Sequence, residues 1–182
     1  MVLTSLSKYP SNSGYALNIL LSCSSFKFLP GSDKILEQGK IENYDLAISV
    51  DCTDLKRLVG AKEYFETAKT TIEIDHHSVN AMFADFNYVD PAAPSCCQVL
   101  IAMFEYYGVE ITKDIATCIL TGIITDTGGF QWGGVTPETF EFAAELIRKE
   151  DDVCVTMPDY SKDLVNSLDL ALAEYHCSNK DF

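Results

Sequence analysis

The chain has 182 residues, of which 47% are hydrophobic and 11% aromatic. This is the size and composition of one globular domain with a real core, which excludes a disordered or collagen-like chain. Acidic residues outnumber basic ones by 27 to 13, giving a formal net charge of −14. So acidic a surface excludes non-specific binding of duplex nucleic acid, because that binding needs basic side chains to neutralise phosphates.

The seven cysteines are an odd number and contain no Cys-x-x-Cys pair. Reduced thiols are the simplest interpretation, so we predict a cytoplasmic protein. The apolar run at 115–124 has about half the length of a membrane span, and we predict no membrane partner. A short apolar stretch at 16–21 before Cys23 faintly resembles a lipoprotein signal, but it is too short and residues 10–14 interrupt it.

Three segments are expected along the chain. Residues 1–14 are polar and aperiodic, residues 15–150 alternate between strand and helix patterns, and residues 151–182 contain one more helix, at 163–175, and a tail. The alternation predicts an α/β fold with a largely parallel sheet flanked by helices. A doubly wound sheet normally opens with a strand and its crossover helix, and we expect this chain to lack that opening unit.

The individual elements follow from apolar spacing and from turn residues. Strands are predicted at 15–21, 44–50, 71–74 and 84–89. Helices are predicted at 32–38 before Gly39, over 54–67 with a break near Gly60, and over 95–107, 112–121 and 137–149. Gly108 stops the first of the last three helices, and the other two have predicted N-caps at Thr112 and, before Pro137, at Thr136.

Acidic residues and a histidine pair follow the apolar runs. Asp51 comes directly after strand 44–50, and Asp75 comes directly after strand 71–74 and opens Asp75-His76-His77. Asp126 follows the apolar run 118–124. Ligands of open α/β sheets bind at the carboxyl ends of the strands, where such side chains converge. Two carboxylates and an imidazole suit Mn²⁺, Fe²⁺, Co²⁺ or Zn²⁺, which would lower the pKa of a bound water.

Each residue alone has an ordinary structural interpretation. Asp51 is a candidate helix N-cap, and Asp126 is a candidate turn residue before two glycines. A histidine pair such as His76 and His77 is more often structural or exposed than catalytic. Cys52 lacks an evident positive neighbour that would lower its pKa, so we expect a packed thiol rather than a nucleophile. The metal hypothesis therefore depends on the combined set.

Taken in order, this set resembles the motifs of the DHH phosphoesterase family. Its context resembles the oligoribonuclease/pAp-phosphatase branch, called NrnA, over roughly residues 15–149. The matching segments are residues 28–31 (Phe-Leu-Pro-Gly), 44–46, 50–58, 74–77, 88–91 (Tyr-Val-Asp-Pro), 121–128 and 136–139, with the helix that ends at 143–147. Asp-His-His alone would be a weak signal, whereas the ordered set is highly specific.

The resemblance implies a fold, a cofactor and a role for each residue. The enzyme would hydrolyse phosphoesters with Mn²⁺, or alternatively Mg²⁺ or Co²⁺. Asp51 would bridge two ions, His76 and Asp126 would bind the second ion, and His77 would contact the scissile phosphate or the leaving oxygen. Asp75 would orient His76 and fix its tautomer. The implied substrates are short oligoribonucleotides, 3′-phosphoadenosine 5′-phosphate (pAp) or a cyclic dinucleotide.

The sequence departs from the family pattern in three places. The family's first motif, a histidine and two aspartates, has no counterpart before Asp51, where the only aspartates are Asp33 and Asp45. No glycine-rich, histidine-containing substrate motif follows, and Gly133 or Gly134 stands where the family has asparagine. We therefore expect a chain incomplete at both ends, with one strong metal site and impaired turnover.

An incomplete sheet would leave an edge or an apolar face exposed, so we also expect a homo-oligomer. Two alternatives to an active phosphoesterase stay open. One is a non-catalytic metal-binding or interaction remnant of such an enzyme. The other is a manganese-dependent inorganic pyrophosphatase, which shares Asp-His-His but is disfavoured by the Leu-Pro-Gly and Val-Asp-Pro contexts.

Overall fold

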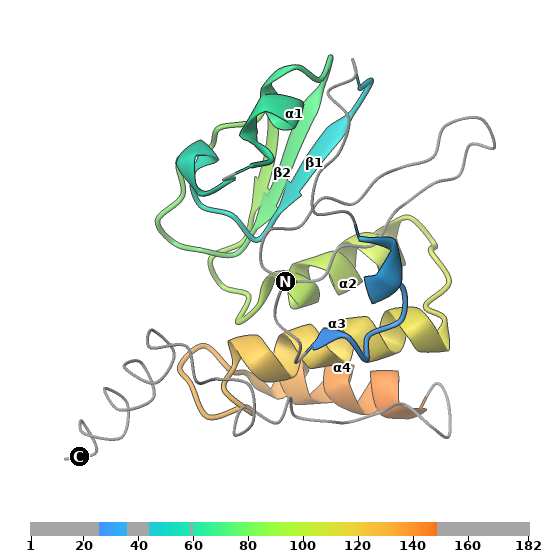
Figure 1. Cartoon of the computed structure of the whole chain (residues 1–182). Coiled ribbons are helices and arrows are strands. Elements are labelled where there is room, and N and C mark those ends of the chain that lie inside the picture. The colour runs from blue at the N-terminus through green and yellow to red at the C-terminus, as the bar shows by residue number, and fades with distance from the viewer. Residues whose placement is uncertain (1–25, 36–43, 59, 149–182) are drawn as a thin grey trace, which may run out of the picture.

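The computed structural model describes residues 26–35, 44–58 and 60–148. In this part of the chain a parallel sheet has the strand order β1-β2-β3, formed by β1 (Ala47–Val50), β2 (Thr71–Asp75) and β3 (Phe86–Val89). Figure 1 shows the sheet lying above a layer of helices. The predicted parallel α/β fold is confirmed, and the strands lie within or beside the predicted ranges.

The central strand is the most buried one, because it has a neighbour on each side. Ile74 pairs with Val50 of β1 and with Tyr88 of β3, so these side chains form one row across the sheet. Side chains alternate between faces along a strand, which places Glu73 and Asp75 on the face opposite to Ile74. The carboxyl ends of β1 and β2 therefore lie side by side at one edge, as the site prediction requires.

Three amphipathic or buried helices are stacked on one side of the sheet, with α2 next to it. They are α2 (Cys96–Tyr106), α3 (Lys113–Asp126) and α4 (Pro137–Arg148). The Thr112 hydroxyl accepts a hydrogen bond from the Ile115 amide, so the N-cap predicted there is confirmed. The Ser95 hydroxyl caps α2 in the same way, by accepting from the Gln98 amide. At the start of α4, the Thr136 carbonyl accepts from the Thr139 amide. Helix α2 contacts β2, α3 packs on α2, and α4 packs on α3.

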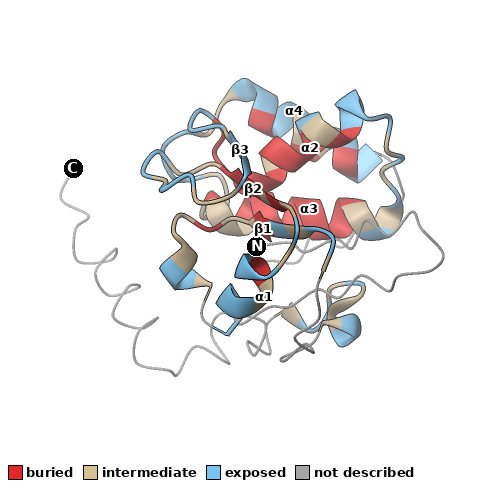
Figure 2. Cartoon of the chain, turned by 90° about the horizontal axis from the view of Figure 1, so that it is seen from above, coloured by how far each residue is buried: buried red, intermediate tan, exposed pale blue. Residues whose placement is uncertain are grey.

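The core lies where β2, α2 and α3 meet, which Figure 2 shows as the main buried region. Ala116, Ile119 and Ile123 of α3 have no exposed surface. Helix α3 is buried on most sides between α2 and α4, which explains why its sequence is apolar rather than strictly amphipathic. No helix in the described part of the chain is both long and apolar enough to cross a bilayer.

Short helical pieces connect the strands. The predicted helical segment with a break near Gly60 is present as a 3₁₀ turn, η3 (Leu55–Arg57), and α1 (Lys62–Glu66), which contacts β1. The predicted helix at 32–38 is described only as the 3₁₀ turn η2 (Ser32–Lys34). The strand predicted at 15–21, the helix at 163–175 and the segment boundaries at 14/15 and 150/151 lie outside the described residues.

Helix α3 is longer than the sequence predicted, since it runs to Asp126 instead of ending near residue 121. Its threonines bond back to the helix: Thr121 donates to the Thr117 carbonyl at 2.8 Å and Thr125 donates to the Thr121 carbonyl at 2.9 Å. These bonds satisfy hydroxyls that otherwise favour turns or strands. As a result, Asp126 is the last residue of a helix rather than a turn residue.

Candidate metal centre

Asp51 lies directly after β1, in a backbone conformation that is unusual for a residue with a side chain. Its φ is +60°, in the left-handed region, which aspartate tolerates better than most residues. Its amide donates to the Ile74 carbonyl at 2.9 Å, which ties this turn to the end of β2. Asp51 is not a helix N-cap, because the side chain that caps η3 belongs to Asp54.

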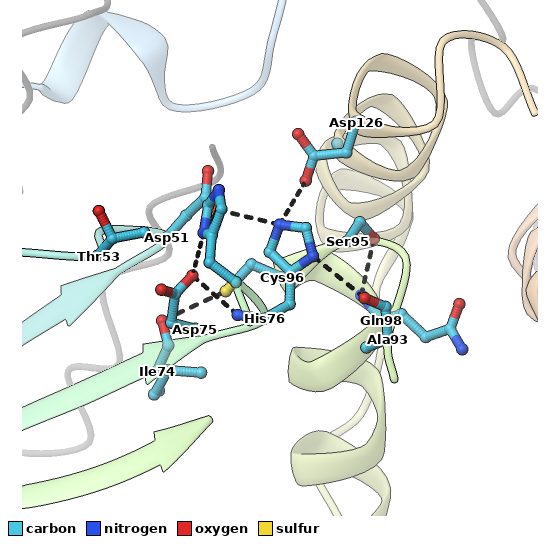
Figure 3. A network of polar contacts seen from close by, with 12 residues as sticks. Asp51, Thr53, Ile74, Asp75, His76, Ala93, Ser95, Cys96, Gln98 and Asp126 are labelled. Atoms are coloured by element: carbon cyan, nitrogen blue, oxygen red, sulfur yellow. Dashed lines mark hydrogen bonds and ion pairs between the residues drawn. The ribbon is translucent and has the colours of Figure 1, made fainter. Parts of the chain in front are cut away.

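The ring of His76 lies between two carboxylates that come from different elements (Figure 3). Its Nε2 is 3.5 Å from Oδ1 of Asp51 and 3.8 Å from Oδ2 of Asp126, which extends from the end of α3. Its Nδ1 is 3.1 Å from the Ala93 carbonyl oxygen. A carbonyl only accepts, so Nδ1 carries the proton and Nε2 faces the carboxylates with either a proton or a lone pair. A metal cation beside Nε2 would bind to the lone pair, so it requires Nε2 without a proton.

Asp75 and His77 form a second pair at the same edge. Asp75 is fully buried, and its Oδ1 accepts hydrogen bonds from the His77 Nδ1 at 2.7 Å and from the His76 amide at 2.8 Å. The prediction that Asp75 orients the His76 ring is therefore wrong, since the Ala93 carbonyl holds that ring. The chain leaves β2 after Asp75, and in this turn the ring of His77 lies next to the Asp75 carboxylate while the ring of His76 lies next to the Ala93 carbonyl.

The residues fit a divalent ion on two observations. Oδ1 of Asp51 is buried and has no hydrogen-bond partner among the described residues, although an acceptor with no donor is costly to bury. Ligand atoms on one such ion lie about 3.0–3.5 Å apart, close to the spacing of His76 Nε2 from its two neighbours. The Asp51, Asp75, His76 and His77 ligand atoms all lie within 4.8 Å of one another.

Within this group the hydrogen bonds separate candidate ligands from supporting residues. Both oxygens of Asp75 already accept hydrogen bonds, Oδ1 from the histidines and Oδ2 from the Asn80 side chain. Its lone pairs are thus largely occupied, whereas those of Asp51 Oδ1 are available. Within the group, Asp51 and His76 therefore have ligand atoms available, whereas Asp75 supports His77. Asp126 lies outside the group and approaches His76 Nε2.

The pKa values of the three candidate ligands reflect their close packing. Burial raises the pKa of Asp126, and the negative charge of Asp51 raises it further. Burial is the largest single effect on Asp51 and opposes its ionisation, but the contact with His76 and the other nearby positive charges, including His77, together outweigh it, so the pKa of Asp51 is lowered. Contact with Asp51 raises the pKa of His76 despite its burial. The raised pKa values of Asp126 and His76 favour the protonated forms of these two groups, whereas the lowered pKa of Asp51 favours its anion beside a positive charge.

Two residues that support the site were not predicted from the sequence. Glu73 has no exposed surface, and its Oε1 accepts a hydrogen bond from the Asn80 amide at 2.6 Å. The sequence contains a pattern that could have indicated them, because a glutamate between two isoleucines of a buried strand requires a buried hydrogen-bond donor. Asn80 follows the histidine pair closely enough to supply one.

Comparison with known proteins agrees with the site. Residues 5–123, more than half of the chain, match the family described as "DHH family, N-terminal domain". The bifunctional oligoribonuclease and PAP phosphatase NrnA of Thermus thermophilus is 36% identical over 123 residues, which cover 66% of this chain and 36% of that protein. NrnA of Bacillus subtilis is 28% identical over 117 residues, which cover 62% of this chain and 37% of that protein.

A solved structure supports the fold. The crystal structure of an exopolyphosphatase-related protein from Bacteroides fragilis aligns with a TM-score of 0.65 and 26% identity, over 86% of this chain and 49% of that one. The chain spans about a third of the length of the two curated relatives named above. The family match covers the β1 and β2 ends that carry Asp51 and the histidine pair, and the chain therefore belongs to the DHH family.

Proposed function

We propose that this chain carries the metal-binding part of a phosphoesterase of the NrnA type. The observation that carries the proposal is the position of His76 Nε2, between Asp51 and Asp126, with Nδ1 held by a backbone carbonyl. The relatives named oligoribonuclease and PAP phosphatase support the substrate class, which is short oligoribonucleotides and pAp. The acidic net charge of −14 agrees with a small substrate rather than a duplex.

Asp51, His76 and Asp126 would hold the ion, which we propose is Mn²⁺, with Mg²⁺ or Co²⁺ as alternatives. When bound, such an ion polarises a phosphoryl oxygen as a Lewis acid. The Ala93 carbonyl keeps the lone pair of His76 on Nε2, because it holds the proton on Nδ1. These residues therefore bind and orient, and they perform no covalent step.

We propose His77 as the residue that exchanges a proton with the substrate. Its side chain is 42% exposed, so a substrate oxygen can reach the ring. Because Nδ1 donates to Asp75, the other ring nitrogen is left to accept or donate a proton. The reaction adds water across the P–O ester bond, giving a phosphate group on one product and a hydroxyl on the other.

The test is hydrolysis of pAp and of a short oligoribonucleotide with Mn²⁺, beside His76→Ala and with inorganic pyrophosphate as a third substrate. We expect slow turnover of the nucleotides that disappears in His76→Ala, because the described residues gather ligands for one ion. Turnover of pyrophosphate alone would favour the pyrophosphatase alternative. Metal binding without any turnover would favour a non-catalytic remnant.

Self-association is also proposed. Ile48, Ile72 and Phe86 form one row across the sheet, with Ile48 39% and Phe86 65% exposed. Ile72, in the middle of the row, packs against the core, so the exposed apolar surface is that of Ile48 and Phe86 on its two sides. Exposed apolar side chains of this size favour contact with a second copy. Sedimentation velocity should show a dimer or larger assembly, and a monodisperse monomer at high concentration would contradict it. We also propose that the protein is cytoplasmic, where Cys52, Cys96, Cys97 and Cys118 would be reduced thiols.

A further inference from the structure

We propose that Asn80 is a positioning residue that sets the orientation of His77 by holding Asp75. The catalytic meaning of that orientation rests on the proposed function, whereas the orientation itself does not. Asn80 lies in the loop between β2 and β3 and is not among the candidate ligands. Its contacts connect two buried carboxylates to the histidine pair.

The Asn80 amide group makes three short hydrogen bonds. Its Nδ2 donates to Oε1 of Glu73 and to Oδ2 of Asp75, each at 2.6 Å, and its Oδ1 accepts from the Met82 amide at 2.6 Å. Only this orientation of the amide is consistent with the surroundings. The opposite one would put the amide oxygen against two carboxylates and the NH₂ group against a backbone N–H.

The contact with Asn80 matters because Asp75 has no exposed surface. Water therefore cannot replace a lost donor without rearrangement, and the Asn80 amide is the donor found at Oδ2. If Asn80 were removed, the Asp75 carboxyl group would rotate to find a new donor or would take up a proton. Either change disturbs Oδ1, which accepts from His77 Nδ1 at 2.7 Å.

Asn80 itself is held from two sides. Glu73 is fully buried, and its Oε2 accepts from the Phe83 amide at 3.2 Å while Oε1 accepts from Asn80. The neighbouring Ala81 amide donates to the Thr53 carbonyl at 2.9 Å, which ties the loop to the turn after β1. The chain of contacts therefore runs from Glu73 through Asn80 and Asp75 to His77.

The two histidines depend on this chain of contacts differently. The ring of His76 is held by the Ala93 carbonyl, on a different element. The ring of His77 is held by Asp75, whose other oxygen is bonded to Asn80. Loss of the Asn80 amide should therefore affect His77 and leave the His76 tautomer unchanged. A general structural defect would affect both.

The experiment compares Asn80→Ala with Asn87→Ala in the full chain without metal. Asn87 is a matched control, since its side chain also bonds a local amide and a local carbonyl, both of Ala84. Asn87 lies beside Glu73 in the sheet, but among the described residues its side chain hydrogen-bonds neither Glu73 nor Asp75. The readout is the side-chain ¹H–¹⁵N NMR spectrum of the histidines, which reports the tautomer and the exchange of the Nδ1 proton. Should Asn80→Ala fail to fold, Asn80→Ser takes its place, because its single hydroxyl donor cannot serve both carboxylates.

In wild type and Asn87→Ala, we expect His77 to show a protected Nδ1 proton. In the Asn80 variant that proton should exchange at least about tenfold faster, with His76 unchanged. A wild-type His77 spectrum in a folded Asn80 variant would overturn the proposal, as would equal changes at both histidines. Loss of folding in both Asn80 variants would also overturn it, because the role would then be structural.

Kinetics separate this proposal from the proposed function. If wild type turns over pAp, the Asn80 variant should lower kcat by about 10–100-fold and change KM by less than about threefold. If wild type turns over no phosphoester, the proposed function fails, and the NMR comparison still decides the role of Asn80. Turnover that is unaffected by the Asn80 variant would contradict the positioning role alone.

Discussion

Nε2 of His76 lies 3.5 Å from Oδ1 of Asp51, and this contact joins the ends of two neighbouring parallel strands. Asp126, from the end of α3, approaches the same nitrogen. Three elements far apart in sequence thus bring two carboxylates and one imidazole together. Such a set is stable only with positive charge between its members, supplied by a proton or by an ion.

The role of Asp126 can be tested within its own helix. Asp126→Asn should weaken Mn²⁺ binding by about 10–100-fold, because it removes a charged ligand. Asp114→Asn is the matched control: it makes the same charge change at the exposed first turn of α3. Isothermal titration of both variants with Mn²⁺ checks this, and an equal loss of affinity in both would indicate a long-range charge effect instead.

Gly128, which follows the end of α3, should tolerate alanine less well than Gly108 does. Both have positive φ, +58° and +64°, so alanine costs each about 1–2 kcal/mol. A Cβ at Gly128 would also overlap the Trp132 indole, whereas one at Gly108 would meet nothing within 4 Å. Urea unfolding should therefore show that Gly128→Ala lowers the free energy of unfolding by about 1–3 kcal/mol more than Gly108→Ala does.

A double variant serves as the control for that overlap. Adding Trp132→Ala to Gly128→Ala removes the clashing ring and should reduce the difference from Gly108→Ala. The stability cost of Gly128→Ala is thus measured twice, once in wild type and once in the Trp132→Ala background. If the two costs are equal, the clash with the indole is not the cause.

Glu73 should make the stability of the chain fall as pH rises. Burial raises the pKa of this carboxyl, and the charge of Asp75 adds to that effect. The folded state therefore binds a proton that the unfolded state releases, above the ordinary pKa of about 4.3. The stabilising contribution is complete below that pH and is lost as pH rises through the folded-state pKa.

Glu73→Gln removes this titration while keeping one oxygen for Asn80. The free energy of unfolding of wild type minus that of Glu73→Gln should therefore decrease from about pH 4.3 upwards. Urea unfolding at a series of pH values measures the difference, in which the other titrating groups largely cancel. A difference that increases with pH would show that the pKa of Glu73 is lowered instead.

The described cysteines should react slowly with thiol reagents while the chain is folded. Cys52, Cys96, Cys97 and Cys118 are buried, and burial raises the pKa of Cys97 to about 12 and that of Cys118 to about 11. Few of these thiols are thiolates at pH 8, and the thiolate is the reactive form. The variant with serine at Cys23, Cys154 and Cys177 isolates them.

The measurement is labelling with a chromogenic disulfide reagent, with and without guanidinium. We expect four labelled thiols in guanidinium, one for each remaining cysteine, and slow labelling of the folded variant. Rapid labelling of Cys52 in the folded variant would revive its interpretation as a nucleophile.

Much of the fold was predictable from local patterns. Buried strands such as Thr71–Asp75 are indicated by short segments rich in β-branched residues. Thr112 marks a helix start by a side-chain bond that depends only on near neighbours. The end of α3 was not predictable in this way. Whether a threonine bonds back to its own helix or favours a turn depends on the packing around it, which the sequence does not state.

The sequence predicted which residues of the candidate site lie close together, but not which hydrogen bonds they make. Carboxyl ends of parallel strands meet at one edge, so Asp51 and the histidine pair were expected to be close. Which histidine ring Asp75 contacts depends on the path of the backbone after β2 and on the position of the Ala93 carbonyl. The role of Asn80 could not be predicted, because it depends on the burial of Glu73 and Asp75. That burial exists only once the loop has folded over β2.

The most direct test of the metal centre is isothermal titration of the full chain with Mn²⁺, for wild type and His76→Ala. We predict one tightly bound ion per wild-type chain and an affinity at least about 100-fold lower in His76→Ala, with circular dichroism showing the same fold. Equal affinity in the two proteins, or two tightly bound ions per wild-type chain, would contradict a single centre formed by Asp51, His76 and Asp126.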